Sequence, residues 1–251
     1  MKTEVNSEEK SIRILEENKA INGQDVVLTI DQNLQNAVHK IMGNNVGAAT
    51  VMNIQNGEIL AMCSTPSFDS NKFIDGFSYD EWNKISEDER KPFLNKAING
   101  EYPPGSTFKI VTALAGLEDG LLNPDDKVFC SGKTKYGKRN FHCWKDKGHE
   151  EVDLRKAIKE SCDVYFYDLA RRLGIEKIAN MALRLGFGRN FDLISDKERN
   201  GLVPTKKWIE NNINNNWNLG DTLVAGIGQG YISATPLQLN VMISMLSLIH
   251  I

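Results

Sequence analysis

The stretch that most constrains this chain is the segment YPPGSTFKI at residues 102–110. Two prolines and a glycine cannot easily continue a helix or a strand, so they place Ser106 at a boundary between elements. Apolar residues then recur at helical spacing as far as a glycine at position 120, which predicts a helix over residues 106–117. Ser106 and Lys109 are three residues apart, so we expect them to share one face of this helix.

This pair of residues suggests a nucleophile and its base. A serine hydroxyl is a weak nucleophile until a neighbouring group removes its proton. A lysine that is desolvated and crowded can lose its charge and act as that base. The helix N-terminus adds free N–H groups that favour a developing oxyanion. The alternative interpretation is that Ser106 is an ordinary helix N-cap.

The composition restricts the class of protein. The chain has 251 residues, enough for one large domain, and its 41% hydrophobic and 25% charged residues are ordinary for a globular protein. A net charge of −3 gives no indication of a nucleic-acid partner. We find no run of 18 apolar residues and no secretory signal peptide after Met1.

The first hundred residues alternate between polar segments and short regular elements. We interpret residues 1–25 as a polar lead-in or linker. The sequence then predicts a strand over 26–30, a helix over 31–41 that begins at Asp31 and ends near Gly43, a hairpin over 46–62 around an Asn-Gly turn, and an irregular surface excursion with short helices over 63–100.

The second half of the chain is mainly helical by the same criteria. We expect residues 121–152 to be rich in loops and residues 196–222 to form a solvated loop. Helices are predicted over 154–160, 164–173 and 175–185, a tight turn over 227–230, and a last helix from Thr235 to Met245.

Three of the four cysteines fall within residues 130–162 and need an explanation. Cys130, Cys143, His149 and Cys162 together supply three thiols and one imidazole, a set that binds zinc in a tetrahedral structural site. The spacing lacks a short C-x2-C pair, so a Cys130–Cys143 disulfide or buried free thiols are the alternatives. His142 is the weaker ligand candidate, and Cys63 is expected to be a small core residue.

Four motifs in the right order give the chain a family resemblance. They are LTID with LQ at 28–35, PPGSTFK at 103–109, SCDVYFY at 161–167, and GQGY with ATPLQ at 228–238. With these motifs the chain resembles the penicillin-binding transpeptidases, and most closely the class B enzymes of the cell-elongation machinery. The resemblance extends over residues 25–245.

The resemblance implies both the fold and the reaction. The fold would be α+β, of the penicillin-binding transpeptidase and serine β-lactamase type, with an antiparallel sheet flanked by helices. Ser106 would be the acylated nucleophile, Lys109 its base and Ser161 a proton shuttle. Asp163 occupies the position where the family usually has Asn, and an ionised Asp only accepts hydrogen bonds. The function implied is a D,D-transpeptidase that cross-links peptidoglycan stem peptides and is a target of β-lactams.

The family's third motif, K-[ST]-G, does not occur in the chain, since Lys133-Thr134 is followed by Lys135. We therefore expect residues 26–245 to be a transpeptidase domain without its last strands, and this fragment by itself to be inactive. The membrane helix and pedestal region of the family are also expected to lie outside the chain. Residues 246–251 resemble the translation of a sequencing adapter, and our hypothesis is that they are an artefact; the alternative is a genuine helix end.

The resemblance also implies partners, a location and a metal. The partners would be an elongation glycosyltransferase and scaffold proteins, at the periplasmic face of the bacterial inner membrane. Members of this group have a zinc site of carboxylate, His and Cys ligands beside the active site, and His149 and Cys162 match that pattern directly. The alternatives are a division-type transpeptidase, a D,D-carboxypeptidase or a β-lactamase of the same fold, or a non-catalytic β-lactam sensor or structural protein.

Overall fold

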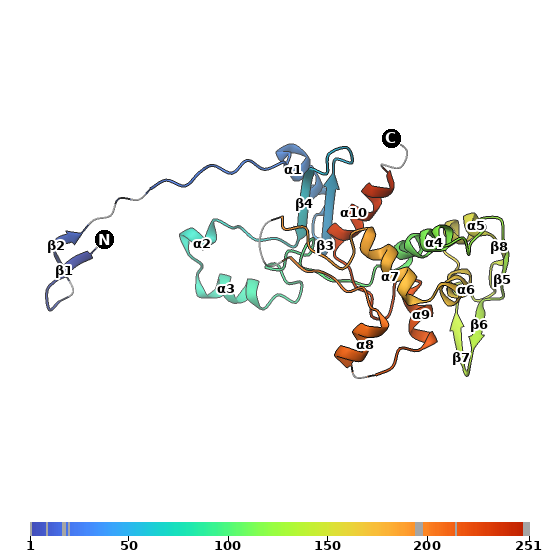
Figure 1. Ribbon diagram of the computed structural model, residues 1–251. Coiled ribbons are helices and arrows are strands. Elements are labelled where there is room, and N and C mark those ends of the chain that lie inside the picture. Colours follow the sequence, from blue (N-terminus) through green and yellow to red (C-terminus); the bar gives the residue numbers. More distant parts are fainter. Residues whose placement is uncertain are drawn as a thin grey trace.

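The computed structural model describes residues 2–8, 10–16, 19, 21–193, 198–213 and 215–247. At the N-terminus, strands β1 (Lys2–Val5) and β2 (Ser11–Glu16) pair as an antiparallel hairpin within the segment predicted to be a polar linker. An extended stretch of chain separates this hairpin from the main body (Figure 1). The boundaries predicted for the linker and the domain remain predictions.

The strand predicted over residues 26–30 is wrong. Residues 21–30 form no helix or strand, and Val26 and Val27 are 82% and 94% exposed. The segment meets β4 only at its end, where the Thr29 hydroxyl donates to the Ile59 carbonyl at 2.7 Å. A strand is stabilised by a ladder of hydrogen bonds to a neighbour, and the described chain offers none beside Val26 and Val27.

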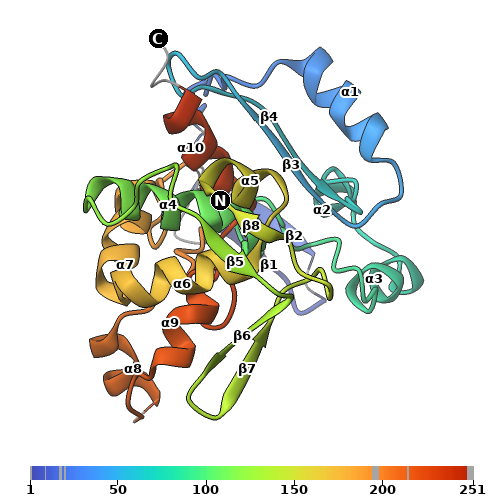
Figure 2. The same ribbon diagram turned by 90° about the vertical axis from the view of Figure 1, so that its right-hand side faces the viewer.

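The helix and hairpin that follow confirm their predictions. Helix α1 (Gln32–Met42) begins where the Asp31 carboxylate accepts the Leu34 N–H at 2.9 Å, and it ends at Gly43, which has a positive φ. Strands β3 (Gly47–Met52) and β4 (Ile59–Thr65) pair in antiparallel register. Burial alternates along β4, and α1 covers part of this hairpin (Figure 2).

An aromatic cluster organises the surface excursion that follows the hairpin. Two short helices, α2 (Lys72–Asp75) and α3 (Tyr79–Ser86), lie within it, as predicted. The Ser78 side chain and Glu81 cap α3 reciprocally. Edge-to-face and tilted ring contacts join five aromatic side chains: Phe68, Phe73, Phe77, Trp82 and Phe93.

The main core lies in the helical half of the molecule. A 3-10 turn (Gly105–Phe108) leads into α4 (Lys109–Glu118), which packs against α6 (Asp163–Leu173) and α7 (Ile175–Arg184). Helix α5 (Leu154–Lys159) begins at Asp153, as predicted. Helix α6 is the central element of this part of the chain: it also packs against α9 (Leu219–Ala225), and most of its side chains are buried. Figure 1 shows these helices grouped on one side of the β3–β4 hairpin.

Two segments predicted to be loops contain regular structure. Residues 121–152 hold two antiparallel pairs, β5 (Val128–Cys130) with β8 (Glu150–Val152) and β6 (Lys133–Tyr136) with β7 (Arg139–His142). Strands of three or four residues are too short to show a reliable alternation in the sequence. The segment 196–222 contains α8 (Lys206–Ile213) and the start of α9, which Asn218 and Asp221 cap reciprocally.

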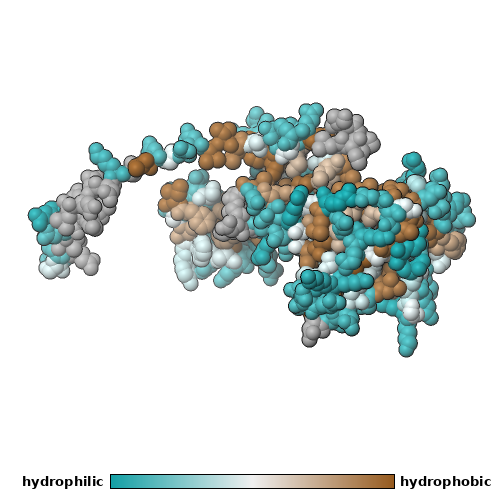
Figure 3. All heavy atoms as spheres, in the orientation of Figure 1, coloured by the Kyte–Doolittle hydropathy of each residue, from teal (hydrophilic) through white to brown (hydrophobic). Residues whose placement is uncertain are grey.

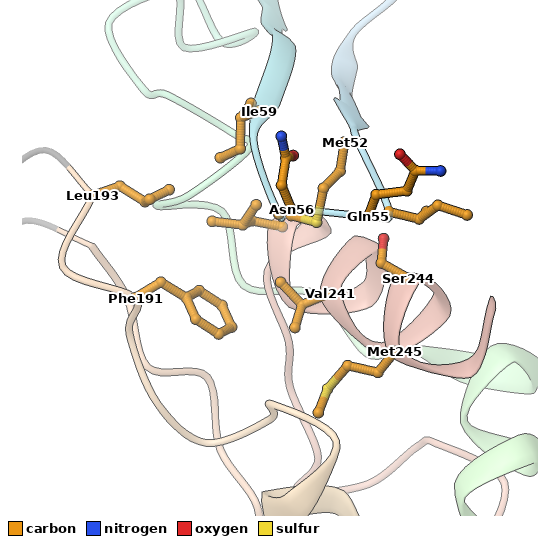
Figure 4. A pocket seen from close by; sticks show the side chains of 12 residues that line it. Met52, Gln55, Asn56, Ile59, Phe191, Leu193, Val241, Ser244 and Met245 are labelled. Carbon is orange, nitrogen blue, oxygen red and sulfur yellow. The ribbon is translucent and has the colours of Figure 1, made fainter. Parts of the chain in front are cut away.

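The last helix, α10 (Pro236–Ser247), runs alongside the β3 strand. An apolar pocket lies between α10 and the turn end of the β3–β4 hairpin. Figure 4 shows Met52 and Ile59 from the hairpin and Val241 from α10 around this pocket, with Phe191 on the opposite side. Among the described residues, no helix combines the length and the apolar character that crossing a bilayer requires.

Candidate active site and the adjoining cysteine cluster

Ser106 lies in the 3-10 turn that precedes α4, with its side chain exposed to solvent. Backbone hydrogen bonds hold the start of the turn and the segment before it: Tyr102 exchanges two with Ala234, and the Gly105 N–H donates to the Gly228 carbonyl at 2.8 Å. A Cβ on Gly228 would lie 2.2 Å from the Gly105 carbonyl oxygen, and Gly228 has a φ of +74°. The predicted turn at 227–230 therefore buttresses the serine turn, and only glycine fits at that point.

Lys109, the first residue of α4, is buried and uses all of its donors. Its side chain is 3% exposed, and its Nζ atom donates to the Ser161 carbonyl at 2.9 Å, to Ser161 Oγ at 2.9 Å and to Asp163 Oδ1 at 2.6 Å. An ammonium group has three N–H donors, so each has an acceptor. The Phe166 ring lies beneath it, with its centroid 5.7 Å from Nζ.

Ser161 connects the lysine to the exposed serine. Its Oγ atom donates to Ser106 Oγ at 2.8 Å and accepts from Lys109. Ser161 has a φ of +53°, a left-handed conformation that is costly for a residue with a side chain. The turn between α5 and α6 maintains this conformation and aims the hydroxyl at Ser106. Among the described residues, Lys109 therefore reaches Ser106 through Ser161 and not by a direct hydrogen bond.

Asp163 is the fourth member of this network, at the start of α6. Its Oδ2 atom accepts the backbone N–H of Trp144 at 3.0 Å, while Oδ1 accepts from Lys109. The structure thus joins Ser106, Lys109, Ser161 and Asp163 in one hydrogen-bonded chain, although they come from two segments more than fifty residues apart.

Trp144 is a residue of this site that the sequence reasoning missed. Besides its backbone contact with Asp163, its indole N–H donates to the Glu160 carbonyl at 3.0 Å. Its side chain is nevertheless exposed, and its ring packs against His149 with centroids 5.5 Å apart. The only sequence signal is its position directly after Cys143, a candidate metal ligand.

The four predicted metal ligands also converge. One ligand atom from each of Cys130, Cys143, His149 and Cys162 lies within 4.8 Å of the other three, and all four residues are buried. All four cysteines of the chain are free thiols, so no disulfide joins Cys130 to Cys143. His142 lies outside the group, exposed at the end of β7, and Cys63 is buried in β4 away from the cluster, as expected.

The geometry of the cluster fits a tetrahedral metal centre. His149 Nδ1 is 3.6 Å from Cys130 Sγ and 3.5 Å from Cys143 Sγ. In a tetrahedral zinc site with ordinary bond lengths, a nitrogen and a sulfur ligand lie about 3.5 Å apart. The Nε2 atom of His149 is buried without a hydrogen-bond partner among the described residues, and its nearest carboxylate, Glu160, is 3.9 Å away.

Burial shapes the chemistry of these ligands. It lowers the pKa of the His149 imidazole, which keeps the ring in the neutral form that binds a metal. It also raises the pKa of the Cys162 thiol, so that thiol stays protonated until a metal displaces the proton.

The cysteine cluster and the hydrogen-bonded network of Ser106, Lys109, Ser161 and Asp163, which we call the serine network, include neighbouring residues of the same segments. Cys162 lies between Ser161 and Asp163, and Cys143 directly precedes Trp144. A metal held by these cysteines would therefore fix two of the segments that position Asp163.

Comparisons with known proteins identify the family of the chain. Residues 47–248 match the family model described as penicillin binding protein transpeptidase domain. The curated peptidoglycan D,D-transpeptidase MrdA of Haemophilus influenzae is 37% identical over 237 residues, which cover 94% of this chain and 36% of that protein. The chain thus spans just over a third of the length of this relative.

Solved structures give the same result. The crystal structure of Pseudomonas aeruginosa PBP2 in complex with WCK 5153 has a TM-score of 0.87 at 38% identity and covers 90% of this chain and 52% of that one. Helicobacter pylori PBP2, solved in complex with MreC, has a TM-score of 0.83 at 36% identity and covers 94% of this chain and 45% of that one.

Proposed function

Because this chain belongs to the family of the penicillin-binding protein transpeptidase domain, we propose that the protein carrying it is a peptidoglycan D,D-transpeptidase of the penicillin-binding protein 2 group. One observation carries the proposal: an exposed serine is hydrogen-bonded through Ser161 to a buried lysine that is paired with an aspartate. Such a chain supplies a nucleophile, a proton route and a base at one point.

In the first half of the reaction, Ser106 Oγ would attack the carbonyl of the penultimate D-alanine of a stem peptide. Its proton would pass to the Ser161 hydroxyl, while the proton of that hydroxyl passes to the Lys109 amine. Lys109 would accept this proton in its neutral form, and Asp163, whose Oδ1 atom is 2.6 Å from Nζ, would stabilise the ammonium group that forms. The tetrahedral intermediate then collapses and releases the terminal D-alanine, whose amine takes up a proton by the reverse route.

In the second half, an amine from a neighbouring stem peptide would attack the acyl-enzyme carbonyl and release Ser106. The new amide bond is the cross-link. A β-lactam carbonyl would acylate the same oxygen but, with its leaving amine still tethered, would leave the serine blocked. Of the two oxyanion donors that acyl transfer uses, the Ser106 backbone N–H is one, and the other would come from a K-[ST]-G strand. Removing one such donor costs about 3 kcal/mol, and substrate docking on that strand is lost with it, so we expect the 251 residues by themselves to be inactive.

We also propose that the cysteine cluster holds zinc. Three thiolates and the Nδ1 atom of His149 form a closed four-ligand set, which is typical of a structural site. The metal would supply rigidity to the turn that carries Ser161, and this account assigns it no part in the bond-making steps. The Helicobacter pylori protein is solved in complex with MreC. We propose that the protein carrying this chain likewise binds partner proteins at the cell envelope, namely scaffold proteins and a glycosyltransferase.

Replacing Lys109 with methionine tests the proposed base. In the natural protein that carries these residues, we expect the rate of acylation by a fluorescent penicillin to fall about 10²- to 10⁴-fold, the usual contribution of a general base. The variant also leaves the Asp163 carboxylate without a cation, which could itself destabilise the site. The double variant Lys109→Met/Asp163→Asn removes both charges and should be measured beside it.

Lys96 provides the matched control. It is the other buried lysine among the described residues, and its Nζ atom donates to the Lys91 carbonyl, away from the serine. The Lys96→Met variant should lose some stability and keep its acylation rate. Equal acylation rates in the Lys96 and Lys109 variants would show that the lysine in the serine network is only structural.

A further inference from the structure

The hairpin β6–β7 and the loop after it concentrate positive charge. Within residues 133–147 there are six cationic side chains and one acidic one, a local net charge of +5 in a chain whose net charge is −3. We call residues 133–147 the basic arm. Its cationic residues are Lys133, Lys135, Lys138, Arg139, Lys145 and Lys147.

These cations are exposed and lack acidic partners. No salt bridge joins any of the six to a carboxylate within the described part of the chain. Cations elsewhere are commonly paired, as Lys127 is with Glu151 and Lys177 with Asp119. Lys133 and Lys135 lie two residues apart on the same face of the hairpin, so their like charges repel one another and gain no stability from pairing.

The arm begins at the catalytic network. The Cys143 N–H donates to the Gly132 carbonyl at 2.8 Å and closes the base of the hairpin. The next residue, Trp144, donates its backbone N–H to Asp163. From this base the paired strands run for four residues, about 13 Å at the usual rise of a strand. The hairpin projects from the helical body (Figure 2). Because the base of the arm is joined to Asp163 through Trp144, the arm extends outward from the hydrogen-bonded network that contains Ser106.

The two faces of the hairpin differ. Phe141 is buried against Tyr167, and Arg139 lies over the Phe141 ring. On the opposite face, Lys133 and Lys135 have His142 and Asn140 as their cross-strand partners. Figure 3 shows mostly hydrophilic atoms where the hairpin projects. On the two strands, Phe141 turns inward, and the one exposed large apolar side chain of the arm, Trp144, lies at its base with its ring against His149. The projecting part of the arm therefore lacks the apolar anchors with which a basic segment inserts into a lipid surface.

We propose that the basic arm binds the carboxylates of an acidic peptide whose reacting end lies at Ser106, namely the stem peptide of uncross-linked peptidoglycan. The inference rests on the proposed function and specifies how that site receives its substrate. Exposed charges on a projecting hairpin attract a flexible anionic chain and guide it toward the serine without needing a deep pocket. Because the charges involved are solvated, the affinity of the arm for the peptide should fall as the salt concentration rises.

The test compares two triple variants that lose the same charge. The arm variant is Lys133→Gln/Lys135→Gln/Lys138→Gln, and the control variant is Lys40→Gln/Lys84→Gln/Lys207→Gln, which changes exposed lysines on α1, α3 and α8. Each is made in the natural protein and checked for an unchanged melting temperature. The probes are a stem pentapeptide with free side-chain carboxylates and the same peptide with those side chains amidated, and the measured quantity is the dissociation constant at low and high salt.

We expect the arm variant to bind the free-carboxylate peptide about tenfold more weakly at low salt, as the loss of three solvated charge contacts implies. The control variant should bind like the wild type, and amidation should remove both the salt dependence and the effect of the arm substitutions. Equal binding by the arm and control variants, or no binding of the peptide by the wild type, would overturn the inference. So would loss of binding to vesicles of anionic lipid in the arm variant with peptide binding unchanged, since the arm would then be a membrane contact.

Penicillin labelling of wild-type Ser106 separates this inference from the proposed function. A labelled serine with no effect of the arm substitutions refutes only the role of the arm. An unlabelled serine refutes the proposed function itself.

Discussion

Replacing Ser106 with alanine is expected to abolish covalent labelling by penicillin, because the oxygen that forms the ester is removed. Labelling should be lost completely. A variant of the base, by contrast, should only be labelled more slowly. The fold should survive, since the Ser106 side chain is exposed and its hydrogen bond to Ser161 is one of several that hold Ser161. The measurement is the intact mass of the natural protein after incubation with penicillin.

Ser70 gives the matched control for this substitution. It is an exposed serine in the loop before α2, far along the chain from the serine network. The Ser70→Ala variant should gain the mass of one penicillin, as the wild type does. A Ser106→Ala variant that still gained this mass would place the nucleophile elsewhere and refute the assignment.

Replacing Cys130 with alanine is expected to remove most of the bound zinc and to destabilise the helical half of the molecule. Structural zinc sites contribute folding free energy directly, and a site left with three ligands binds more weakly. We expect a loss of at least about 3 kcal/mol in the free energy of unfolding, which lowers the melting temperature of a domain this size by roughly 6–12 °C. Cys130 is preferred to Cys143 or Cys162 because it is not adjacent to a residue of the serine network.

Cys63 allows the same chemical change outside the cluster. Both cysteines are almost fully buried, so Cys63→Ala removes the same atoms from a comparable environment. This control should keep about one zinc per chain and lose only about 1 kcal/mol, the usual cost of a small core truncation. Equal zinc contents and equal melting temperatures in the two variants would show that the cluster is a set of buried thiols. So would less than about a tenth of an equivalent of zinc in wild-type protein with reduced thiols.

The elements that the sequence predicted well are those specified by neighbouring residues. Asp31 and Gly43 define the ends of α1, and Asp153 begins α5, because helix caps act within one turn of the chain. The Pro-Pro-Gly segment likewise places Ser106 at a helix start, although the structure begins that helix with a 3-10 turn. The comparisons confirm the penicillin-binding transpeptidase fold that the motifs indicated.

The errors have a different physical origin. The apolar run at 26–30 has the composition of a strand, but whether it pairs depends on a neighbour that local sequence does not specify. The asparagine-rich segment before α9 was predicted to be a solvated loop because its residues are polar. Two of these polar residues, Asn218 and Asp221, in fact cap the start of α9 reciprocally.

The site itself was predicted by motif and not by local physics. The residues Ser106, Lys109, Ser161 and Asp163 were expected to act together, and the structure adds that Ser161 lies between the other serine and the lysine. Trp144 was missed because its two hydrogen bonds reach residues sixteen and nineteen positions away. The roles assigned to all of these residues stay predictions until the variants are measured.

The measurement that tests the central claim most directly is turnover of a stem pentapeptide ending in D-alanyl-D-alanine, in the presence of an amine acceptor. It should use the natural protein that carries these residues, because no K-[ST]-G tripeptide occurs among the 251. A transpeptidase releases one D-alanine for each peptide joined to the acceptor, and penicillin blocks both products. Release of D-alanine with only hydrolysed peptide would instead identify a carboxypeptidase, and no release at all would contradict the enzymatic role.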